Sequence, residues 1–193
     1  MFMARATRST YNVSFRRRRE GKTNYTKRNA MLSSGACRLV VRKTSRYVTA
    51  QVVSYSDEGD CIISSASSKD LASFGLPPLK NVVSAYLVGY WAAKKAAAKG
   101  TKKSILDIGR RTPTKSMFAF AALKGALDAG MEIPHSKDVF DDERFSGKHI
   151  AEYAKSLKDS NPELYSKVFS AYVGKGIFPE SLPGLVDDIK SKM

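Results

Sequence analysis

Polar and apolar residues alternate along three consecutive segments in the first half of the chain. These segments are residues 37–43, 46–55 and 60–65, and each is rich in valine, isoleucine, tyrosine or threonine. A period of two with this composition is typical of β-strands. The connections are short, and residues 56–59 (SDEG) supply an aspartate and a glycine that favour a turn. The pattern therefore predicts an antiparallel meander of three strands.

Beyond two prolines at positions 77 and 78, the apolar spacing changes from two to three and four. The apolar positions that repeat in this way are Val82, Val83, Tyr86, Leu87, Tyr90 and Trp91. Such spacing is typical of an amphipathic helix. Lysines crowd the last turns before Gly100, where the helix dipole favours cations and a glycine favours a cap. We therefore expect one long helix that ends at Gly100.

Residues 104–108 form a short, mostly apolar run between two helical patterns. A strand that parallel pairing buries on both faces of a sheet has this composition. Thr112 is then a suitable N-cap, with Pro113 at the first helical position, for a helix that ends at Gly130. Residues 131–133 are apolar enough to add one more strand.

After residue 135 the composition becomes acidic and polar, and helical patterns follow at 149–158, 162–173 and 183–192. The whole pattern predicts an α/β protein in three parts. In the mixed α/β core, residues 37–135, a parallel strand joins the antiparallel meander, and helices pack on the resulting mixed sheet. Residues 1–36 are a basic N-terminal extension, and residues 136–193 are a helical C-terminal extension.

The N-terminal extension has no consistent period, and its aromatic residues are scattered among cations and small polar residues. We expect it to be largely disordered on its own, apart from a short helix over residues 24–32. Charge adds a gradient: residues 1–49 hold 13 lysines and arginines against one acid, whereas residues 131–193 hold 9 against 11. This gradient and the net charge of +15 favour a polyanionic partner at the N-terminal end. A merely soluble basic surface is the alternative.

Cys37 and Cys61 are the only cysteines, and neither lies at zinc-ligand spacing from another cysteine or a histidine. We interpret both as small apolar core residues in a reducing compartment. The first residues include arginines but lack the apolar segment of a signal peptide, and no uncharged stretch reaches the roughly 18 residues that span a bilayer. These features predict a soluble, intracellular protein with no membrane partner.

The strongest candidate for binding is the arginine run at positions 16–19, together with the residues that follow it. Its members are Arg16, Arg17, Arg18, Arg19, Lys22, Tyr25, Lys27 and Arg28. Guanidinium groups fit phosphate oxygens with two hydrogen bonds and stack on bases, and tyrosine adds a stacking surface. This combination indicates contact with RNA, and a targeting signal or a solvated tail is the alternative.

A second candidate lies on the first hairpin of the meander. It comprises Arg38, Arg42, Lys43, Arg46, Tyr47 and Gln51. Alternation places Arg38 and Arg42 on one face of the first strand and Lys43 on the other, so two arginines project together. That face is a candidate RNA platform, and the alternative is the ordinary solvent-facing charge of an antiparallel sheet.

The third candidate is the segment 109–115, which carries Arg110, Arg111 and Lys115 at the predicted strand-to-helix turn. A helix N-terminus offers unpaired N–H groups and the positive end of a dipole, so these cations and the helix together can hold a phosphate. The segment lacks the GxxxxGK[ST] order of a Walker loop. A purely structural turn is the alternative.

No catalytic constellation assembles from the sequence, because the two histidines are isolated and no serine has an assignable histidine and acid. Asp107 on the predicted buried strand could join Asp57, Asp60 or Asp70 in a metal-dependent nuclease, since such sites need several converging carboxylates. The surrounding positive charge argues against a carboxylate cage. We therefore expect no enzyme, no cofactor, no metal and no small-molecule substrate.

Six long stretches carry a resemblance to a known family. They are residues 11–28 (YNVSFRRRREGKTNYTKR), 38–51 (RLVVRKTSRYVTAQ), 63–75 (ISSASSKDLASFG), 84–89 (SAYLVG), 105–136 (ILDIGRRTPTKSMFAFAALKGALDAGMEIPHS) and 143–153 (ERFSGKHIAEY). They resemble the L-eighteen family of large-subunit ribosomal proteins in its archaeal form, whose eukaryotic relative is called L-five. The likeness covers nearly the whole chain.

The resemblance implies a protein that binds 5S ribosomal RNA and fastens it, with large-subunit ribosomal RNA, into the central protuberance of the large ribosomal subunit. Neighbouring ribosomal proteins are then further partners, and the cytoplasmic ribosome is the location. The family's RNA-contacting arm falls on the first candidate set of this chain, and its strand motif falls on the second. Arg110 and Arg111 occupy a strand-to-helix loop that resembles the family's.

Two other functions remain open from the residues alone. One is a metal-dependent RNA hydrolase that uses Asp107, and incubation with RNA and a divalent cation would reveal it. The other is a general nucleic-acid chaperone with no preferred RNA, and competition between 5S RNA and bulk RNA would reveal that function.

Overall fold

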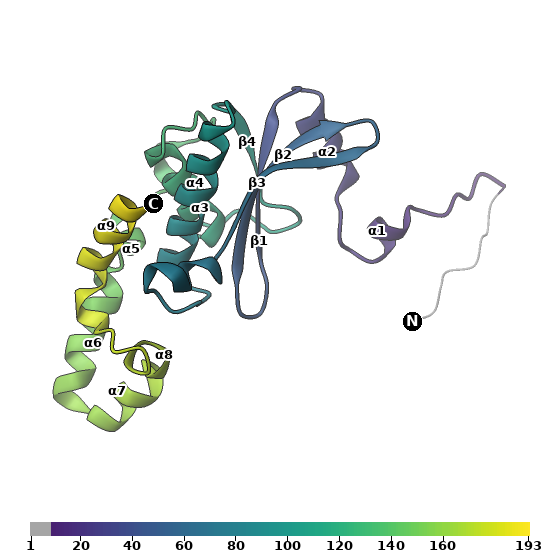
Figure 1. Ribbon diagram of the computed structural model, residues 1–193. Helices are drawn as coiled ribbons and strands as arrows, with labels where there is room; N and C mark the ends of the chain where they lie inside the picture. The colour runs from purple at the N-terminus through teal and green to yellow at the C-terminus, as the bar shows by residue number, and fades with distance from the viewer. Residues whose placement is uncertain (1–8) are drawn as a thin grey trace.

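Four strands form one mixed sheet in the order β3-β2-β1-β4 (Figure 1). The structure is a computed structural model that describes residues 9–193. β1 (Cys37–Lys43), β2 (Val48–Ser56) and β3 (Gly59–Ser67) make the antiparallel meander, and β4 (Ser104–Asp107) pairs parallel with β1. The predicted fold class is therefore confirmed.

Two helices cover one face of this sheet: α3 (Val82–Ala98) and α4 (Phe118–Asp128) (Figure 1). α3 begins where the side chain of Asn81 accepts a hydrogen bond of 2.6 Å from the Ser84 N–H. It ends before Gly100, which has a φ of 83°. The amphipathic spacing and the glycine thus predicted both ends of this helix correctly.

The backbones of α3 and α4 touch at two glycines. A Cβ atom on Gly89 would lie 2.1 Å from the carbonyl oxygen of Ala122, and one on Gly125 would lie 2.1 Å from that of Tyr86. No side chain fits at such a distance, so both positions require glycine. Around this contact the core is almost fully buried, as at Leu87.

α4 begins five residues later than the sequence predicted. Thr112 and Pro113 lie in an irregular loop, and the N-cap is Met117. The cause is a turn at Ser116, which adopts a φ of 61° and donates its backbone N–H to the carbonyl of Val139 at 3.3 Å. The local cap signal of Thr112 and Pro113 is overruled by this long-range contact.

The strand predicted at 131–133 is also wrong. Glu132 makes a single parallel bridge with Lys103, supported by hydrogen bonds on either side of it, and Pro134 follows directly after Ile133. A proline lacks the N–H that a longer ladder needs. In residues 9–193 the sheet therefore has the four strands named above.

The C-terminal part is helical, as the sequence predicted. It packs beside α3 through apolar residues such as Val186. Its elements are α5 (Asp142–Ser146), α6 (Lys148–Ser160), α7 (Pro162–Val168), α8 (Ser170–Val173) and α9 (Leu182–Lys192). Short 3-10 helices also occur: η2 (Lys137–Val139) and η3 (Pro179–Ser181) lie in this part, and η1 (Asp70–Phe74) lies between β3 and α3. No helix in the described part of the chain is long and apolar enough to cross a membrane.

The two cysteines do not both lie in the core. Cys37 is half-buried, and Cys61 is exposed. The interpretation of Cys61 as a core residue is wrong because residues 59–62 of β3 extend beyond the helices that cover the rest of the strand. The thiol of Cys61 therefore faces solvent.

Two helices interrupt the basic N-terminal segment, and residues 9–36 of this segment are called the arm below. α2 (Tyr25–Leu32) confirms the predicted short helix, and its N-cap Asn24 accepts a hydrogen bond of 3.2 Å from the Lys27 N–H. The single turn α1 (Arg16–Arg19) was not predicted. Residues 1–8, which belong to the predicted extension, lie outside the described residues.

Candidate nucleic-acid interface

A cleft of about 370 Å³ separates the arm from the face of the sheet opposite α3 and α4. We call it the basic cleft. Its wall on the arm side comes from α2, from the residues just before that helix and from Arg17, and its other wall comes from β1, β2, β3 and the end of β4. The charged residues on these walls are Arg17, Lys22, Lys27, Arg28, Arg38, Arg42, Asp60 and Asp107. Cations outnumber carboxylates there, so the cleft attracts anions.

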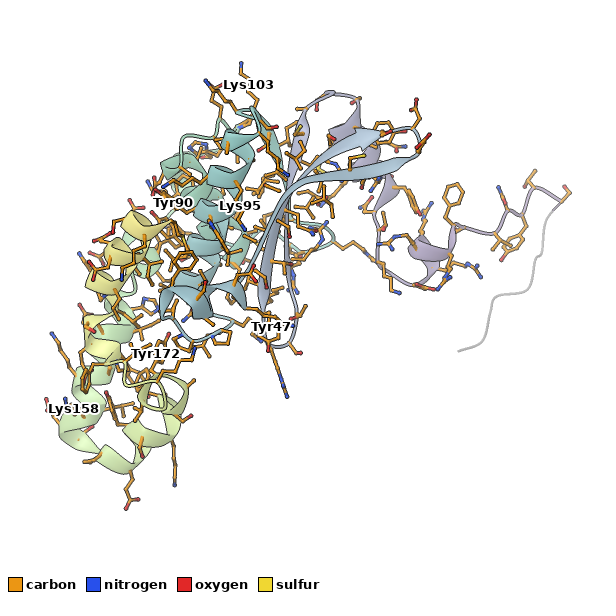
Figure 2. The ribbon with its side chains drawn as sticks, viewed as in Figure 1. Tyr47, Tyr90, Lys95, Lys103, Lys158 and Tyr172 are labelled. Carbon is orange, nitrogen blue, oxygen red and sulfur yellow. The ribbon has the colours of Figure 1, made fainter. Side chains whose placement is uncertain are left out.

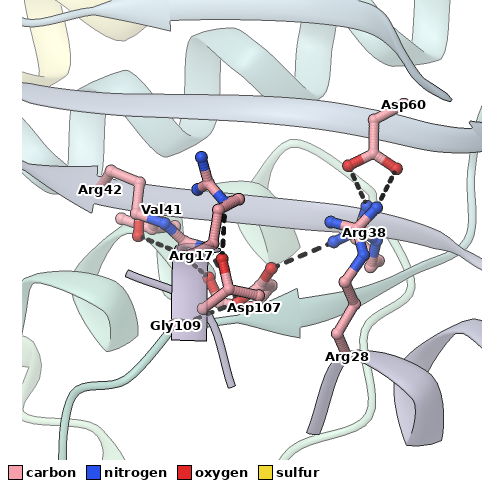
Figure 3. A network of polar contacts seen from close by, with 9 residues as sticks. Arg17, Arg28, Arg38, Val41, Arg42, Asp60, Asp107 and Gly109 are labelled. Carbon is pink, nitrogen blue, oxygen red and sulfur yellow. Dashed lines mark hydrogen bonds and ion pairs between the residues drawn. The ribbon is translucent and has the colours of Figure 1, made fainter. Parts of the chain in front are cut away.

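The arm is held to the sheet by an ion pair between α2 and β3. Arg28 donates a hydrogen bond of 2.8 Å to the carboxylate of Asp60 (Figure 3). The other oxygen of that carboxylate lies 2.7 Å from the guanidinium of Arg38 in β1. Burial by itself would raise the pKa of Asp60, but the adjacent guanidinium groups of Arg38 and Arg28 hold this pKa below its usual value. Asp60 therefore stays ionised and joins three elements.

Arg38 is the most deeply buried cation of the cleft, with only 3% of its side chain exposed. Its guanidinium lies between Asp60 and Asp107, and it donates a hydrogen bond of 3.3 Å to the latter (Figure 3). The contact to Asp60 is an ion pair without hydrogen-bond alignment. A buried charge must be compensated, and these two carboxylates compensate it. In this arrangement Arg38 supports the cleft and is largely withdrawn from solvent.

Asp107 organises the end of β4. It accepts hydrogen bonds from the Gly109 N–H at 2.7 Å and from Arg42 at 3.0 Å (Figure 3). Arg42 also donates to the carbonyl oxygen of Asp107 at 2.7 Å, and 44% of the Arg42 side chain remains exposed. A Cβ atom on Gly109 would lie 3.2 Å from the Arg42 guanidinium, and Gly109 has a φ of 70°, so a glycine suits this position. Arg42 is thus fixed in direction but open to a ligand.

The arginines of α1 are exposed, and of these four Arg17 lines the cleft while the others lie beyond it. Arg16 and Lys22 both pair with Glu20, at 2.7 and 2.8 Å. The hydrogen bond from Lys22 lowers the pKa of Glu20 most, and the hydrogen bond from Arg16 lowers it further. The remaining cations of the predicted set in the arm have no ion-pair partner within residues 9–193; they are Arg17, Arg18, Arg19 and Lys27. These charges are free for a partner outside the chain.

One aromatic residue of the arm was missed by the sequence prediction. Phe15 is 71% exposed, and its ring lies 5.1 Å from that of Tyr25, at an interplanar angle of 53°. Two adjacent rings beside an arginine run make a stacking surface for bases. Phe15 directly precedes the arginine run in the sequence, and this position was the feature from which its place in the candidate site could have been predicted.

The second predicted set is divided by the structure. Arg38, Arg42 and Gln51 line the basic cleft. Tyr47 lies at the far end of the β1–β2 hairpin (Figure 2), where Lys69 stands 4.7 Å above its ring, and the neighbouring Arg46 is exposed. Lys43 points to the opposite face of the sheet, as the alternation predicted, and lies 4.4 Å above the ring of Phe118 in α4.

The third predicted set borders a different hollow, on the helix side of the sheet. Arg110, Arg111 and Lys115 line it together with the start of α4. Arg110 also meets the arm, because a Cβ atom on Gly21 would lie 2.6 Å from its guanidinium nitrogen. The predicted helix start at Thr112 is absent, but the cations still lie near a helix N-terminus, that of α4.

The carboxylates proposed for a nuclease do not converge. Asp107 and Asp60 are separated by the guanidinium of Arg38, and Asp70 accepts the backbone N–H of Ser67 at 3.0 Å. Asp57 lies in the turn between β2 and β3. Within residues 9–193 no three histidine, cysteine, aspartate or glutamate side chains gather closely enough to hold a metal.

The sequence matches proteins of known name over the elements just described. Residues 9–105, which include the arm, the meander and α3, match the family model described as "Ribosomal large subunit proteins 60S L5, and 50S L18". A "Large ribosomal subunit protein uL18" of Thermofilum pendens is 48% identical over 193 residues, covering 99% of this chain and 97% of the relative. Proteins with the same printed name from Caldivirga maquilingensis and Aeropyrum pernix are 47% and 46% identical, covering 97% and 93% of this chain and 92% and 86% of their own lengths.

Proposed function

Because the chain belongs to the family of the large-subunit ribosomal proteins 60S L5 and 50S L18, we propose that it is a structural, RNA-binding constituent of the large ribosomal subunit in the cytoplasm. Its RNA partner is 5S ribosomal RNA. It attaches this RNA to large-subunit ribosomal RNA in the central protuberance, beside other ribosomal proteins. It acts by binding alone, without a catalytic step.

The observation that carries this proposal is the basic cleft. Two walls that come from different parts of the sequence are fixed to each other through Asp60, so their cations keep a defined spacing. A folded RNA is recognised largely by the shape of its backbone, which such a spacing can match. A disordered basic tail has no fixed spacing of this kind.

Direct contacts come from the exposed cations of both walls. Arg17, Lys22, Lys27 and Arg42 meet phosphates, and the exposed arginines of α1 extend the same surface. Phe15 and Tyr25 stack on unpaired bases. Arg38 is a supporting residue, because its charge is taken up by Asp60 and Asp107. Arg46, Tyr47 and Lys115 bind outside the cleft.

Competition binding tests the proposed partner. Labelled 5S ribosomal RNA is bound to the full chain at moderate ionic strength, and either unlabelled 5S RNA or an unrelated structured RNA of equal length is added. We expect 5S RNA to compete at least tenfold better, because non-specific charge alone cannot discriminate between equally charged RNAs. Equal competition would indicate a general nucleic-acid chaperone instead.

The hydrolase alternative has its own test. The chain is incubated with 5S RNA and Mg²⁺ or Mn²⁺, and the RNA is examined for cleavage. We expect intact RNA, because the Arg38 guanidinium occupies the space between the nearest carboxylates. Cleavage that Asp107→Asn abolishes, while the control Asp159→Asn in α6 preserves it, would favour the hydrolase.

A further inference from the structure

A second hollow, of about 580 Å³, lies on the face of the sheet that carries α3 and α4. We call it the loop hollow. It opens at the carboxyl ends of the parallel strands β1 and β4, next to Lys43 and Ile108, and at the start of α4. In open α/β sheets ligands bind in this position, where the strand ends and the following helix leave a crevice. The loop hollow and the basic cleft therefore lie on opposite faces of β1.

Among the residues that the structure describes, every charged side chain that lines the loop hollow is positive. They are Lys43, Arg110, Arg111, Lys115 and Arg144. None of the five has an ion-pair partner in the described part of the chain. Burial lowers the pKa of Lys43, and the nearby charges of Arg111 and Lys80 lower it further. The cations thus repel one another, and an anion between them would relieve that repulsion.

The first turn of α4 points unused hydrogen-bond donors at the same place. Its N-cap Met117 makes no side-chain capping bond. Within residues 9–193, the backbone N–H groups of Phe118 and Ala119 have no acceptor, and both residues line the loop hollow. Free N–H groups and the positive end of the helix dipole together favour a bound anion.

A third observation comes from Ser116, on the wall of the loop hollow. This residue is only 7% exposed, and its hydroxyl has no hydrogen-bond partner among residues 9–193. A buried hydroxyl without a partner is destabilising, so its retention is explained if a ligand satisfies it. The Ser116 hydroxyl is a different group from the helix N–H donors and the cations, and it indicates the same kind of ligand, one rich in acceptor oxygens.

From these three observations we propose that the loop hollow is a second RNA contact, which takes a backbone phosphate between Arg111, Arg144 and the first turn of α4. This inference rests on the proposed function, since it assigns a further site to the same RNA ligand. RNA is favoured over free phosphate because Arg110 lines both the loop hollow and a hollow formed with Arg18 and Tyr25 of the arm. The positive surface is therefore continuous from the arm to this site.

The test measures how 5S RNA affinity falls with salt. Each phosphate that the protein neutralises contributes a slope of about −0.7 to −0.9 in log K against log salt. The double variant Arg111→Gln/Arg144→Gln should make this slope shallower by about 0.7–0.9, which is the contribution of one phosphate. The control Lys155→Gln/Lys167→Gln removes two exposed cations from α6 and α7 and should keep the wild-type slope. All four residues are exposed, so both variants should fold, which circular dichroism checks.

The outcomes separate this inference from the function on which it rests. If neither the wild-type chain nor the control binds 5S RNA, the proposed function fails. If both bind with a steep slope and the Arg111/Arg144 variant has the same slope, the inference about the loop hollow alone is overturned. Free phosphate is the other possible ligand of the loop hollow. Amide NMR spectra recorded with inorganic phosphate, and with chloride at equal ionic strength as the control, test this alternative. Saturable shifts at Phe118 and Ala119 with an unchanged RNA slope would assign the hollow to free phosphate and also overturn the inference.

Discussion

The guanidinium of Arg28 in α2 lies 2.8 Å from the carboxylate of Asp60 in β3. The two side chains are 31% and 29% exposed, so water and salt screen the pair and its direct contribution to stability is about 1 kcal/mol or less. Its importance is geometric, because it joins the two walls of the basic cleft. The same carboxylate compensates Arg38, so the position of the arm is coupled to a buried charge in the sheet.

Replacing Arg38 should destabilise the fold strongly. Arg38→Met leaves Asp60 and Asp107 without their shared cation, and breaking a buried ion pair costs about 3–5 kcal/mol. Urea denaturation of the wild type and the variant measures this loss as a difference in the free energy of unfolding. Arg46→Met at the exposed hairpin end is the control and should change it by about 0.5 kcal/mol or less. Equal effects of the two substitutions would mean that the Arg38 network contributes little.

Asp60 should add an acid-sensitive component to stability. Its pKa in the folded chain is lower than the usual 3.8, so the unfolded chain takes up the proton first as the pH falls. The stabilisation is fully present above about pH 4 to 5 and is lost as the pH falls through the folded pKa. Urea midpoints between pH 6 and pH 2 should therefore fall more steeply for the wild type than for Asp60→Asn. Parallel profiles would rule out this coupling.

The contact between α3 and α4 should not tolerate a methyl group. Gly89→Ala would place its Cβ atom 2.1 Å from a backbone oxygen of α4, and overpacking of this kind costs about 1–3 kcal/mol or more. A Cβ atom on Gly184 in α9 would meet nothing within 4 Å in the described part of the chain, so Gly184→Ala should be stabilising by about 0.5–1 kcal/mol, because alanine favours a helix. Thermal unfolding of both variants gives the comparison, and a Gly89→Ala protein as stable as the wild type would show that the helices can separate.

Hydrophobic period was sufficient to predict the three strands of the meander and α3, and the mostly apolar run at 104–108 predicted β4. The capping signal at Thr112 gave a wrong helix start, because a long-range hydrogen bond from Ser116 to Val139 determines the backbone there. A cap signal read from neighbouring residues does not contain such a contact.

The candidate site was predicted as a set of cations but not as a geometry. The charge of buried Arg38 is compensated in part by Asp107, which lies 69 positions away in the sequence. The parallel pairing of β1 and β4 brings the two residues together. The sequence placed Arg38 and Arg42 on one face correctly, and only the folded chain shows that one is buried and the other open. Charge content therefore indicated the partner class, and tertiary pairing decided which cations remain available.

The most direct measurement is the salt dependence of 5S ribosomal RNA binding by the full chain and by a chain lacking residues 1–30. The deletion removes α1 and most of α2, and with them one wall of the basic cleft. The full chain should show a steep slope of log K against log salt, and the shortened chain should lose about 0.7–0.9 for each phosphate that the arm neutralises. A shortened chain that still unfolds cooperatively and binds with the same slope would contradict the role of the arm.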